Sequence, residues 1–213
     1  MKDNVFFVSG IDTNVGKSYA TGYLAKTWNE QGVRTITQKF IQTGNVGMSE
    51  DIELHRKIMG TGLLPEDESG LTMPEIFTYP CSPHLAAEID HRPIDFDKIE
   101  KATRQLSETY DAVLLEGAGG LMVPLTRDLL TIDYVAQKNY PLIFVTSGKL
   151  GSINHTLLSL EAVTRRGIRL HTVAYNLFPE EDDDIIRRDT EAYIRDLLAK
   201  EYSETHFVIV PKL

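Results

Sequence analysis

A short apolar run leads directly into a glycine-bounded segment that ends in Gly16, Lys17 and Ser18. The run is V-F-F-V at residues 5–8, and residues 10–18 are G-I-D-T-N-V-G-K-S. A strand followed by such a segment is typical of a phosphate-binding loop, whose backbone N–H groups surround an anion. The lysine supplies a charge to the outer phosphates, the serine hydroxyl can ligate Mg²⁺, and the next helix directs its positive end at the anion. The feature predicts a strand–loop–helix unit built around bound phosphate.

The spacing of this loop departs from the usual pattern, because five residues separate Gly10 from Gly16, one more than is common. The segment that follows supports the motif, since residues 17–30 predict a helix with one apolar stripe. The stripe is expected to comprise Tyr19, Ala20, Tyr23, Leu24, Thr27 and Trp28. The alternative is a strand–turn–helix whose glycines only ease a tight turn, but the Gly-Lys-Ser ending in this context favours phosphate binding.

Length and composition limit the class of protein. With 213 residues, of which 42 % are apolar, the chain can build one α/β domain, and we expect residues 1–213 to form a single domain. No apolar run reaches the roughly 18 residues of a membrane span, and the polar start is too short for a signal peptide. The single cysteine, Cys81, rules out an internal disulfide and fits a cytoplasmic protein.

The formal charge of −9 disfavours non-specific nucleic-acid binding, which needs clustered lysine and arginine. The acidic run at residues 180–184 contributes much of this excess. We interpret the run as a solvated loop that enters a helix, with carboxylates near the positive helix end. Hard-metal binding is the less favoured alternative, because adjacent acids lack the spaced ligands of a calcium loop. We therefore expect neither nucleic acid nor membrane as a partner.

Apolar strand candidates alternate with helical stretches along the chain. The expected strands are residues 5–9, 34–40, 112–116, 141–147, 169–175 and 206–210. The expected helices are residues 17–31, 50–59, 97–109, 131–138, 153–166 and 184–199. The strand runs are apolar throughout, which indicates burial on both faces. The pattern predicts an α/β fold with a doubly wound, mostly parallel sheet between two layers of helices.

The carboxyl ends of the predicted strands are the places to look for a site, because ligands bind there in an open parallel sheet. Residues 60–96 are the least regular part of the chain, rich in proline, glycine and acids. We expect this long insertion to help cover a site.

Three candidate residues follow predicted strands or begin the next helix. Lys39 lies near a strand end, where a cation would offset charge on a transferred phosphoryl group; a surface lysine is the alternative. Glu116 ends an apolar strand and precedes G-A-G-G at residues 117–120, an order that resembles a Walker B element holding Mg²⁺; a glycine-rich turn is the alternative. Asp51 begins a helix, where complementing the helix dipole is favoured over metal ligation from the residues alone.

Two further segments carry candidate binding groups. Residues 149–155, K-L-G-S-I-N-H, open a helix whose N-terminus could bind a carboxylate or phosphate, or Ser152 could simply cap it. Asn176 follows a predicted strand and could contact a base edge or cap a turn. No nucleophile emerges, because Cys81 is expected to be a small packed residue and His84 lacks a second ligand at metal spacing.

Together these segments closely resemble the dethiobiotin synthetase family, ATP-dependent cyclo-ligases of the P-loop NTPase superfamily. The similarity extends across most of the chain, and E-G-A-G-G combined with K-L-G-S-I-N-H is far more specific than the phosphate loop alone. The matching positions are Lys39, Asp51, Asn176 and residues 10–18, 80–84, 92–94, 116–120 and 149–155. The resemblance implies a fold of three layers of the P-loop NTPase type and a ligase of biotin synthesis.

The resemblance also implies roles for individual residues. The implied catalytic residues are Lys39 and Lys17, and the implied Mg²⁺ ligands are Ser18, Asp51 and Glu116. The implied nucleotide-binding residues are Asn14, Val15, Gly16, Lys17, Ser18, Tyr19, Asp51, Glu116, Gly117, Ala118, Gly119, Asn176, Leu177 and Pro211, with Asn176 on the adenine. The implied substrate-binding residues are Thr43, Gly151, Ser152 and Asn154, the last three reaching across a homodimer interface to the substrate's carboxylate tail.

The implied reaction joins CO₂ to 7,8-diaminononanoate at the expense of ATP with Mg²⁺. One amine forms a carbamate, whose oxygen attacks the γ-phosphate to give a carbamic–phosphoric anhydride. The second amine then closes the ureido ring as phosphate leaves. The chemistry consists of positioning and charge neutralisation, which agrees with the lack of a candidate nucleophile.

The chain departs from the family at three points. Ser18 stands where threonine is common, which keeps the hydroxyl, and Leu177 stands where an acid is common. The sequence also ends soon after Pro211, which leads us to expect a relaxed preference for ATP over other triphosphates. The rival interpretations are a ParA/MinD-like switch ATPase, whose loop carries an early lysine that is missing here, and a corrin-ring amidase, which needs a further glutaminase domain.

Overall fold

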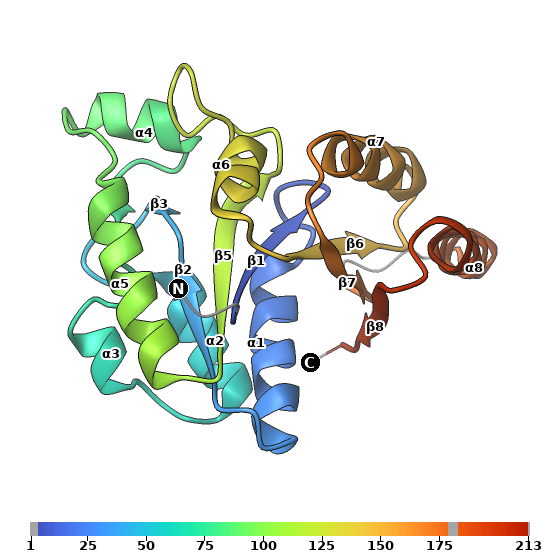
Figure 1. Ribbon diagram of the computed structural model, residues 1–213, viewed down its shortest axis with the longest axis horizontal. Coiled ribbons are helices and arrows are strands. Elements are labelled where there is room, and N and C mark those ends of the chain that lie inside the picture. The colour runs from blue at the N-terminus through green and yellow to red at the C-terminus, as the bar shows by residue number, and fades with distance from the viewer. Residues whose placement is uncertain (1–3, 179–182, 213) are drawn as a thin grey trace.

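A six-stranded parallel sheet forms the centre of the molecule (Figure 1). The computed structural model describes residues 4–178 and 183–212. In spatial order the strands are β2 (Thr35–Lys39), β5 (Ala112–Gly120), β1 (Val5–Gly10), β6 (Leu142–Ser147), β7 (Leu170–Asn176) and β8 (His206–Val210). Strand order reverses at β1, since the chain adds β2 and β5 on one side of it and β6 to β8 on the other. Such a switch point is where open α/β sheets bind ligands.

Helices cover both faces of this sheet. On one face lies α1 (Lys17–Glu30), against which α2 (Glu50–Met59) packs. The opposite face is covered by α5 (Phe96–Thr109), α6 (Thr131–Lys138), α7 (Ser152–Arg165) and α8 (Asp184–Glu201). Figure 1 shows α5 beside the β2 edge and α8 beyond the opposite edge of the sheet. The expected doubly wound, parallel α/β fold of three layers is confirmed.

Consecutive strand residues alternate between two separate apolar clusters. Phe7 and Leu115 belong to the cluster beneath α5 to α8, whereas Val8 and Leu114 belong to the cluster beneath α1. Every residue of β6 is buried. Because side chains of a strand point to opposite faces in turn, a strand covered on both faces is apolar at most positions, and its buried polar side chains, such as Thr146 and Ser147 of β6, are hydrogen-bonded. This explains the continuous apolar runs of the sequence.

Each expected strand and helix is present, with two corrections. First, β5 continues to Gly120 instead of ending at Glu116, because the glycine-rich segment pairs with β1, where Gly10 lies opposite Gly120. Second, the buried stripe of α1 is rotated from the expected one: Tyr19 and Tyr23 are only partly buried. The positions buried in α1 are Lys17, Ala20, Thr21, Gly22, Leu24 and Ala25.

Residues 60–96 contain more regular structure than their composition suggested. They form α3 (Pro65–Glu68), β4 (Ile76–Phe77) and α4 (Pro83–Ile89), and β4 pairs with β3 (Gln42–Thr43) in a small second sheet. These elements are too short to give a periodic signal.

The acidic run before α8 is described only in part, because residues 180–182 lie outside the described residues. Asp183 caps the helix, and its carboxylate accepts hydrogen bonds from the backbone N–H groups of Ile185 and Ile186. This end of the run therefore stabilises a helix start, as expected. In the described part of the chain, no helix is both long and apolar enough to span a membrane.

Candidate active site

The predicted phosphate-binding loop connects β1 to α1. Asn14 and Gly16 adopt left-handed backbone conformations, with φ of 61° and 88°, which turn the loop back before the helix begins at Lys17. The Lys17 side chain is buried, and its Nζ donates a hydrogen bond to the backbone oxygen of Asp12 at 3.0 Å. Burial and the nearby Lys39 ammonium lower the pKa of Lys17 to about 8. The loop thus holds a lysine ammonium at the start of a helix, where anionic oxygens are favoured.

Gly16 is required by both its backbone conformation and its surroundings. A Cβ at this position would overlap the amide nitrogen of Asn176. We expect Gly16→Ala to weaken nucleotide binding by at least about tenfold, because the loop must distort to relieve both the overlap and the left-handed strain. Gly32 is a matched control: its φ is 85°, but nothing lies within 4 Å of a Cβ there. Gly32→Ala should cost stability alone, and equal nucleotide dissociation constants for the two variants would contradict this account.

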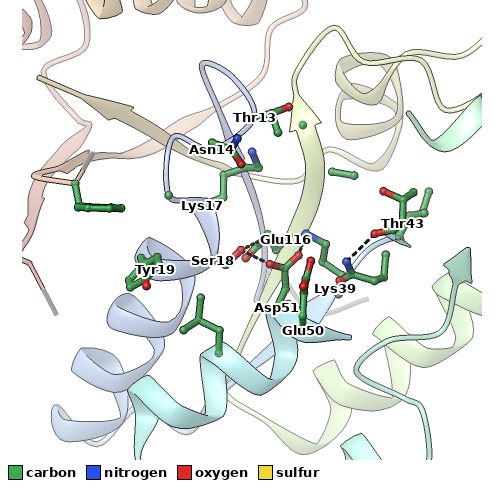
Figure 2. A pocket seen from close by; sticks show the side chains of 17 residues that line it. Thr13, Asn14, Lys17, Ser18, Tyr19, Lys39, Thr43, Glu50, Asp51 and Glu116 are labelled. Atoms are coloured by element: carbon green, nitrogen blue, oxygen red, sulfur yellow. Dashed lines mark hydrogen bonds and ion pairs between the residues drawn. The ribbon is translucent and has the colours of Figure 1, made fainter. Parts of the chain in front are cut away.

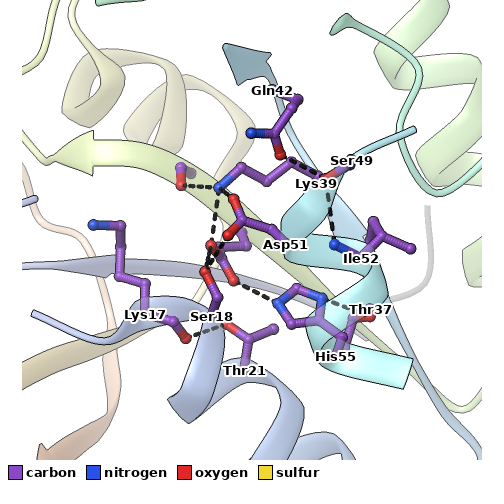
Figure 3. A network of polar contacts seen from close by, with 12 residues as sticks. Lys17, Ser18, Thr21, Thr37, Lys39, Gln42, Ser49, Asp51, Ile52 and His55 are labelled. Carbon is purple, nitrogen blue, oxygen red and sulfur yellow. Dashed lines mark hydrogen bonds and ion pairs between the residues drawn. The ribbon is translucent and has the colours of Figure 1, made fainter. Parts of the chain in front are cut away.

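Oxygen ligands of the type that Mg²⁺ prefers converge beside the loop (Figure 3). The Ser18 hydroxyl oxygen lies 2.6 Å from Asp51 Oδ1 and 2.8 Å from Glu116 Oε1. A hydroxyl has one proton, so it can donate to only one of these carboxylates, and the adjacent Lys39 ammonium supplies positive charge to both of them. The residues present therefore fit a hard divalent cation. Among the described residues, no group of three His, Cys, Asp or Glu side chains is placed to hold a metal ion by itself, which leaves phosphate or water oxygens to complete such a shell.

Lys39 lies inside this cluster and is not a surface lysine. Its Nζ is 2.5 Å from Asp51 Oδ2 and 2.9 Å from Glu116 Oε1, and it also approaches the backbone oxygen of Gly117. Burial acts to lower the pKa of Lys39, but the carboxylates of Glu116 and Asp51 more than offset it and raise the pKa above its ordinary value. Burial likewise acts to raise the pKa of Glu116, and Lys39 and His55 hold it well below its ordinary value. Both side chains are therefore charged.

Strand register explains why these groups meet. Lys39 and Glu116 are direct neighbours on β2 and β5, and Glu116 is opposite Val8 on β1, just before the loop. Asp51 arrives from α2, whose N-terminus is capped by the Ser49 side chain and carries three acids in its first turn. Asp51 therefore complements the helix dipole and also contacts Ser18 and Lys39, so the two alternatives for this residue are compatible.

A cavity of about 500 Å³ opens beside the loop (Figure 2). Its lining includes eleven of the residues singled out from the sequence: Asn14, Gly16, Lys17, Ser18, Tyr19, Lys39, Thr43, Asp51, Glu116, Ala118 and Gly119. The lining residues that sequence reasoning missed are Thr13, Ile41, Gln42, Glu50, Leu54 and Phe178. Most of these are neighbours of predicted residues on the loop, on β3 or on α2, and chain proximity was the only available signal.

Several predicted nucleotide-binding residues do not line this cavity: Val15, Gly117, Asn176, Leu177 and Pro211. Asn176 is buried, and its amide nitrogen donates to the backbone oxygens of Val15, at 2.9 Å, and Phe178. In this structure the Asn176 side chain is therefore hydrogen-bonded to the backbone of the phosphate loop and does not line the cavity. At Gly117 the direction of a Cβ is occupied by the Phe7 ring and does not lead into the cavity.

The predicted carboxylate-binding helix start is separate from the cavity. Gly151 precedes α7 as its N-cap residue, with a left-handed φ of 97°, and Ser152 is the first helical residue. The expectation that Ser152 could cap α7 is therefore wrong: it is buried, and its hydroxyl lies 3.0 Å from that of Ser147. Gly151 and Asn154 are exposed, so this end of α7 is open to contact from outside the chain.

Cys81 does not have the environment of a nucleophile. It packs partly buried against the core, and burial raises the pKa of its thiol. A raised pKa disfavours the thiolate, as expected for a small packed residue.

Comparisons with known proteins agree with this geometry. The family described as AAA domain matches residues 4–213. ATP-dependent dethiobiotin synthetase BioD 2 of Pasteurella multocida is 52 % identical over 206 residues, which cover 97 % of this chain and 96 % of the relative. ATP-dependent dethiobiotin synthetase BioD 2 of Haemophilus influenzae is 57 % identical over 184 residues, covering 86 % and 96 %. Among solved structures, the MinC:MinD complex of Aquifex aeolicus matches with a TM-score of 0.55 at 14 % identity, covering 99 % of this chain and 82 % of the other, which supports the fold alone.

Proposed function

The chain belongs to the ATP-dependent dethiobiotin synthetase family, and from that premise we propose that it carboxylates 7,8-diaminononanoate with CO₂ and closes the ureido ring of dethiobiotin, consuming ATP. The observation that carries the proposal is the convergence of Lys17, Ser18, Lys39, Asp51 and Glu116 in the lining of one cavity. A switch ATPase of the ParA/MinD type shares the fold, but the relatives at 52 % and 57 % identity favour the ligase.

The loop and its lysine would bind the triphosphate. Backbone N–H groups of the loop and the Lys17 ammonium would bind its anionic oxygens, and the start of α1 would add its positive end. The carbamate oxygen then forms a bond to the γ-phosphorus as the bond to ADP breaks. Negative charge shifts onto the leaving oxygen, and Lys39 lies deep enough in the site to counter it. The second amine attacks the carbonyl carbon of the resulting anhydride and expels phosphate.

Ser18, Asp51 and Glu116 would hold Mg²⁺. The ion would neutralise phosphate charge and orient the triphosphate for in-line attack. The hydroxyl and the two carboxylates already contact one another without it, held by Lys39, so little reorganisation is required.

Thr43 on β3 and the start of α7 would bind the diamine substrate. Thr43 lines the cavity, whereas Gly151 and Asn154 are exposed and are not among the residues that line it. We propose that the chain works as a homodimer in the cytoplasm, in which α7 of one subunit reaches the substrate's carboxylate in the other. The exposed side chains of Leu150 and Leu158 beside this helix start support an apolar contact there. The relaxed preference for ATP stays a prediction.

Incorporation of isotope tests the proposed reaction. The chain is incubated with diaminononanoate, ATP, Mg²⁺ and ¹³C-labelled CO₂, and the product is analysed by NMR. We expect one labelled ureido carbon and one ADP for each ring formed. ATP hydrolysis without labelled ring would refute the ligase and favour a switch ATPase.

Glu116→Gln should raise the Mg²⁺ concentration required for half-maximal turnover by at least about tenfold, because it removes one anionic ligand from the cluster. A titration of turnover with Mg²⁺ at saturating ATP measures the effect. Glu53→Gln is the control, since Glu53 is an exposed acid in the first turn of the same helix as Asp51. An unchanged titration in Glu116→Gln would remove this carboxylate from the metal shell.

A further inference from the structure

We propose that His55 is a positioning residue, which fixes the Glu116 carboxylate through a hydrogen bond and is itself fixed by a buried chain of Thr37, Arg56 and Asp67. The inference rests on the proposed function only in that Glu116 is taken as a metal ligand. All five side chains are buried, with at most 2 % of any residue exposed.

The two oxygens of Glu116 face different partners. Oε1 contacts Ser18 and Lys39, at 2.8 and 2.9 Å, whereas Oε2 lies 2.8 Å from His55 Nε2 (Figure 3). One oxygen is therefore directed at the proposed metal, and the other anchors the carboxylate. The imidazole, already engaged with Glu116, is not placed as a ligand itself.

The helix α2 supplies both halves of this arrangement. His55 follows Asp51 by one turn, so the two side chains lie on the same face of α2. Asp51 contacts Ser18 and Lys39, and His55 contacts Glu116. Docking of one helix therefore sets two carboxylates relative to each other.

Hydrogen-bond accounting determines which nitrogen of His55 carries the proton. Arg56 Nη1 donates to Thr37 Oγ1 at 2.9 Å, and His55 Nδ1 lies 3.0 Å from the same oxygen. A guanidinium can only donate, so Thr37 accepts from Arg56, and its own proton is directed to His55 Nδ1. Nδ1 is then an acceptor, and Nε2–H donates to Glu116. This tautomer satisfies every group in the chain.

The far end of the chain is held by a bidentate ion pair. Arg56 Nε and Nη2 donate to the two oxygens of Asp67, at 2.7 and 2.8 Å. Asp67 also accepts from the Thr72 hydroxyl and from the backbone N–H of Leu64. Such a planar pair gives the guanidinium one orientation, which fixes the Thr37 hydroxyl and hence the imidazole. A continuous series of hydrogen bonds thus connects Asp67 of α3 to Glu116 at the proposed metal site.

Two amide substitutions test the two ring nitrogens of His55 separately. In His55→Gln the amide nitrogen can take the place of Nε2 and still donate to Glu116, whereas in His55→Asn the shorter amide reaches only the Thr37 side. We expect His55→Asn to weaken Mn²⁺ binding by about 10–100-fold, measured by electron spin resonance with a non-hydrolysable ATP analogue present, and to lower kcat with little change in KM for ATP. His55→Gln should recover most of that loss.

A variant in the apolar core serves as the control for the effect of lost stability on Mn²⁺ binding. Leu198→Ala removes a buried side chain of α8, which lies beyond the edge of the sheet opposite β2 (Figure 1), and should lower Tm without changing the dissociation constant for Mn²⁺. Equal Mn²⁺ affinities in His55→Gln and His55→Asn would overturn the inference, whether both are weakened or both match the unsubstituted protein. The binding assay needs no ring closure. A chain that makes no dethiobiotin but loses Mn²⁺ only in His55→Asn would refute the proposed function and leave this inference standing.

Discussion

Lys39→Ala should lower kcat about 10²-fold, on the order of 3 kcal/mol of transition-state stabilisation, while the dissociation constant for ATP changes only slightly. The ammonium lies between Asp51 and Glu116 and lines the cavity beside the phosphate loop, where we expect it to act on charge that develops during transfer rather than on the bound nucleotide. Steady-state turnover and equilibrium nucleotide binding, measured on the same preparation, separate the two quantities.

Two further variants make this result interpretable. Lys39→Met keeps most of the side-chain volume and should lose as much kcat as Lys39→Ala, because the charge and not the packing is required. Lys57→Ala, an exposed lysine of α2, should leave kcat unchanged. If kcat survives in Lys39→Ala while nucleotide affinity collapses, the lysine serves binding and not the transition state.

Asp67→Asn should lower the free energy of unfolding by about 3 kcal/mol, because it leaves the buried Arg56 guanidinium without its counter-ion. Denaturant unfolding followed by circular dichroism measures the change. Glu88→Gln is the matched control, since Glu88 pairs with Arg127 at the surface, and it should cost no more than about 1 kcal/mol. Similar losses in the two variants would show that burial does not set the strength of the Arg56–Asp67 pair.

The same carboxylate makes stability depend on pH. Burial acts to raise the pKa of Asp67, but hydrogen bonds from Arg56 and Thr72 more than offset it, so the pKa lies below its ordinary value of 3.8. A depressed carboxylate pKa contributes stability that is present above the unfolded-state pKa and is lost as the pH falls toward the folded-state value. The stability difference between the unsubstituted chain and Asp67→Asn should therefore shrink below about pH 4.

The sheet and its covering helices follow from the sequence because burial leaves a clear pattern. A strand such as β6, enclosed on both faces, contains a continuous apolar run from Leu142 to Val145, and α5 and α7 have the periodicity of helices buried on one side. The continuation of β5 through Gly120 has no such pattern. Glycine has low strand propensity, and the segment contains a left-handed Gly119, with φ of 68°, and a shift in register before Gly120 pairs with Gly10 of β1.

The candidate site was predictable where chain order alone brings groups together. Lys39, Glu116 and the phosphate loop all follow adjacent parallel strands, so their meeting is a consequence of topology. His55 and Arg56 were not predictable in this way. In the sequence they resemble two polar residues of an exposed helix face, and their burial depends on Thr37, Asp67 and Glu116, which lie at distant positions in the chain.

The central claim is that the turn after β1 encloses the triphosphate and presents it to Lys39 and the carboxylates. A crystal structure of the chain with Mg²⁺ and a non-hydrolysable ATP analogue tests it most directly. We predict the β- and γ-phosphates within the N–H groups of residues 12–17, with the metal among Ser18, Asp51 and Glu116. A triphosphate bound elsewhere, with the Ser18 and Glu116 oxygens still in mutual contact, would contradict the account.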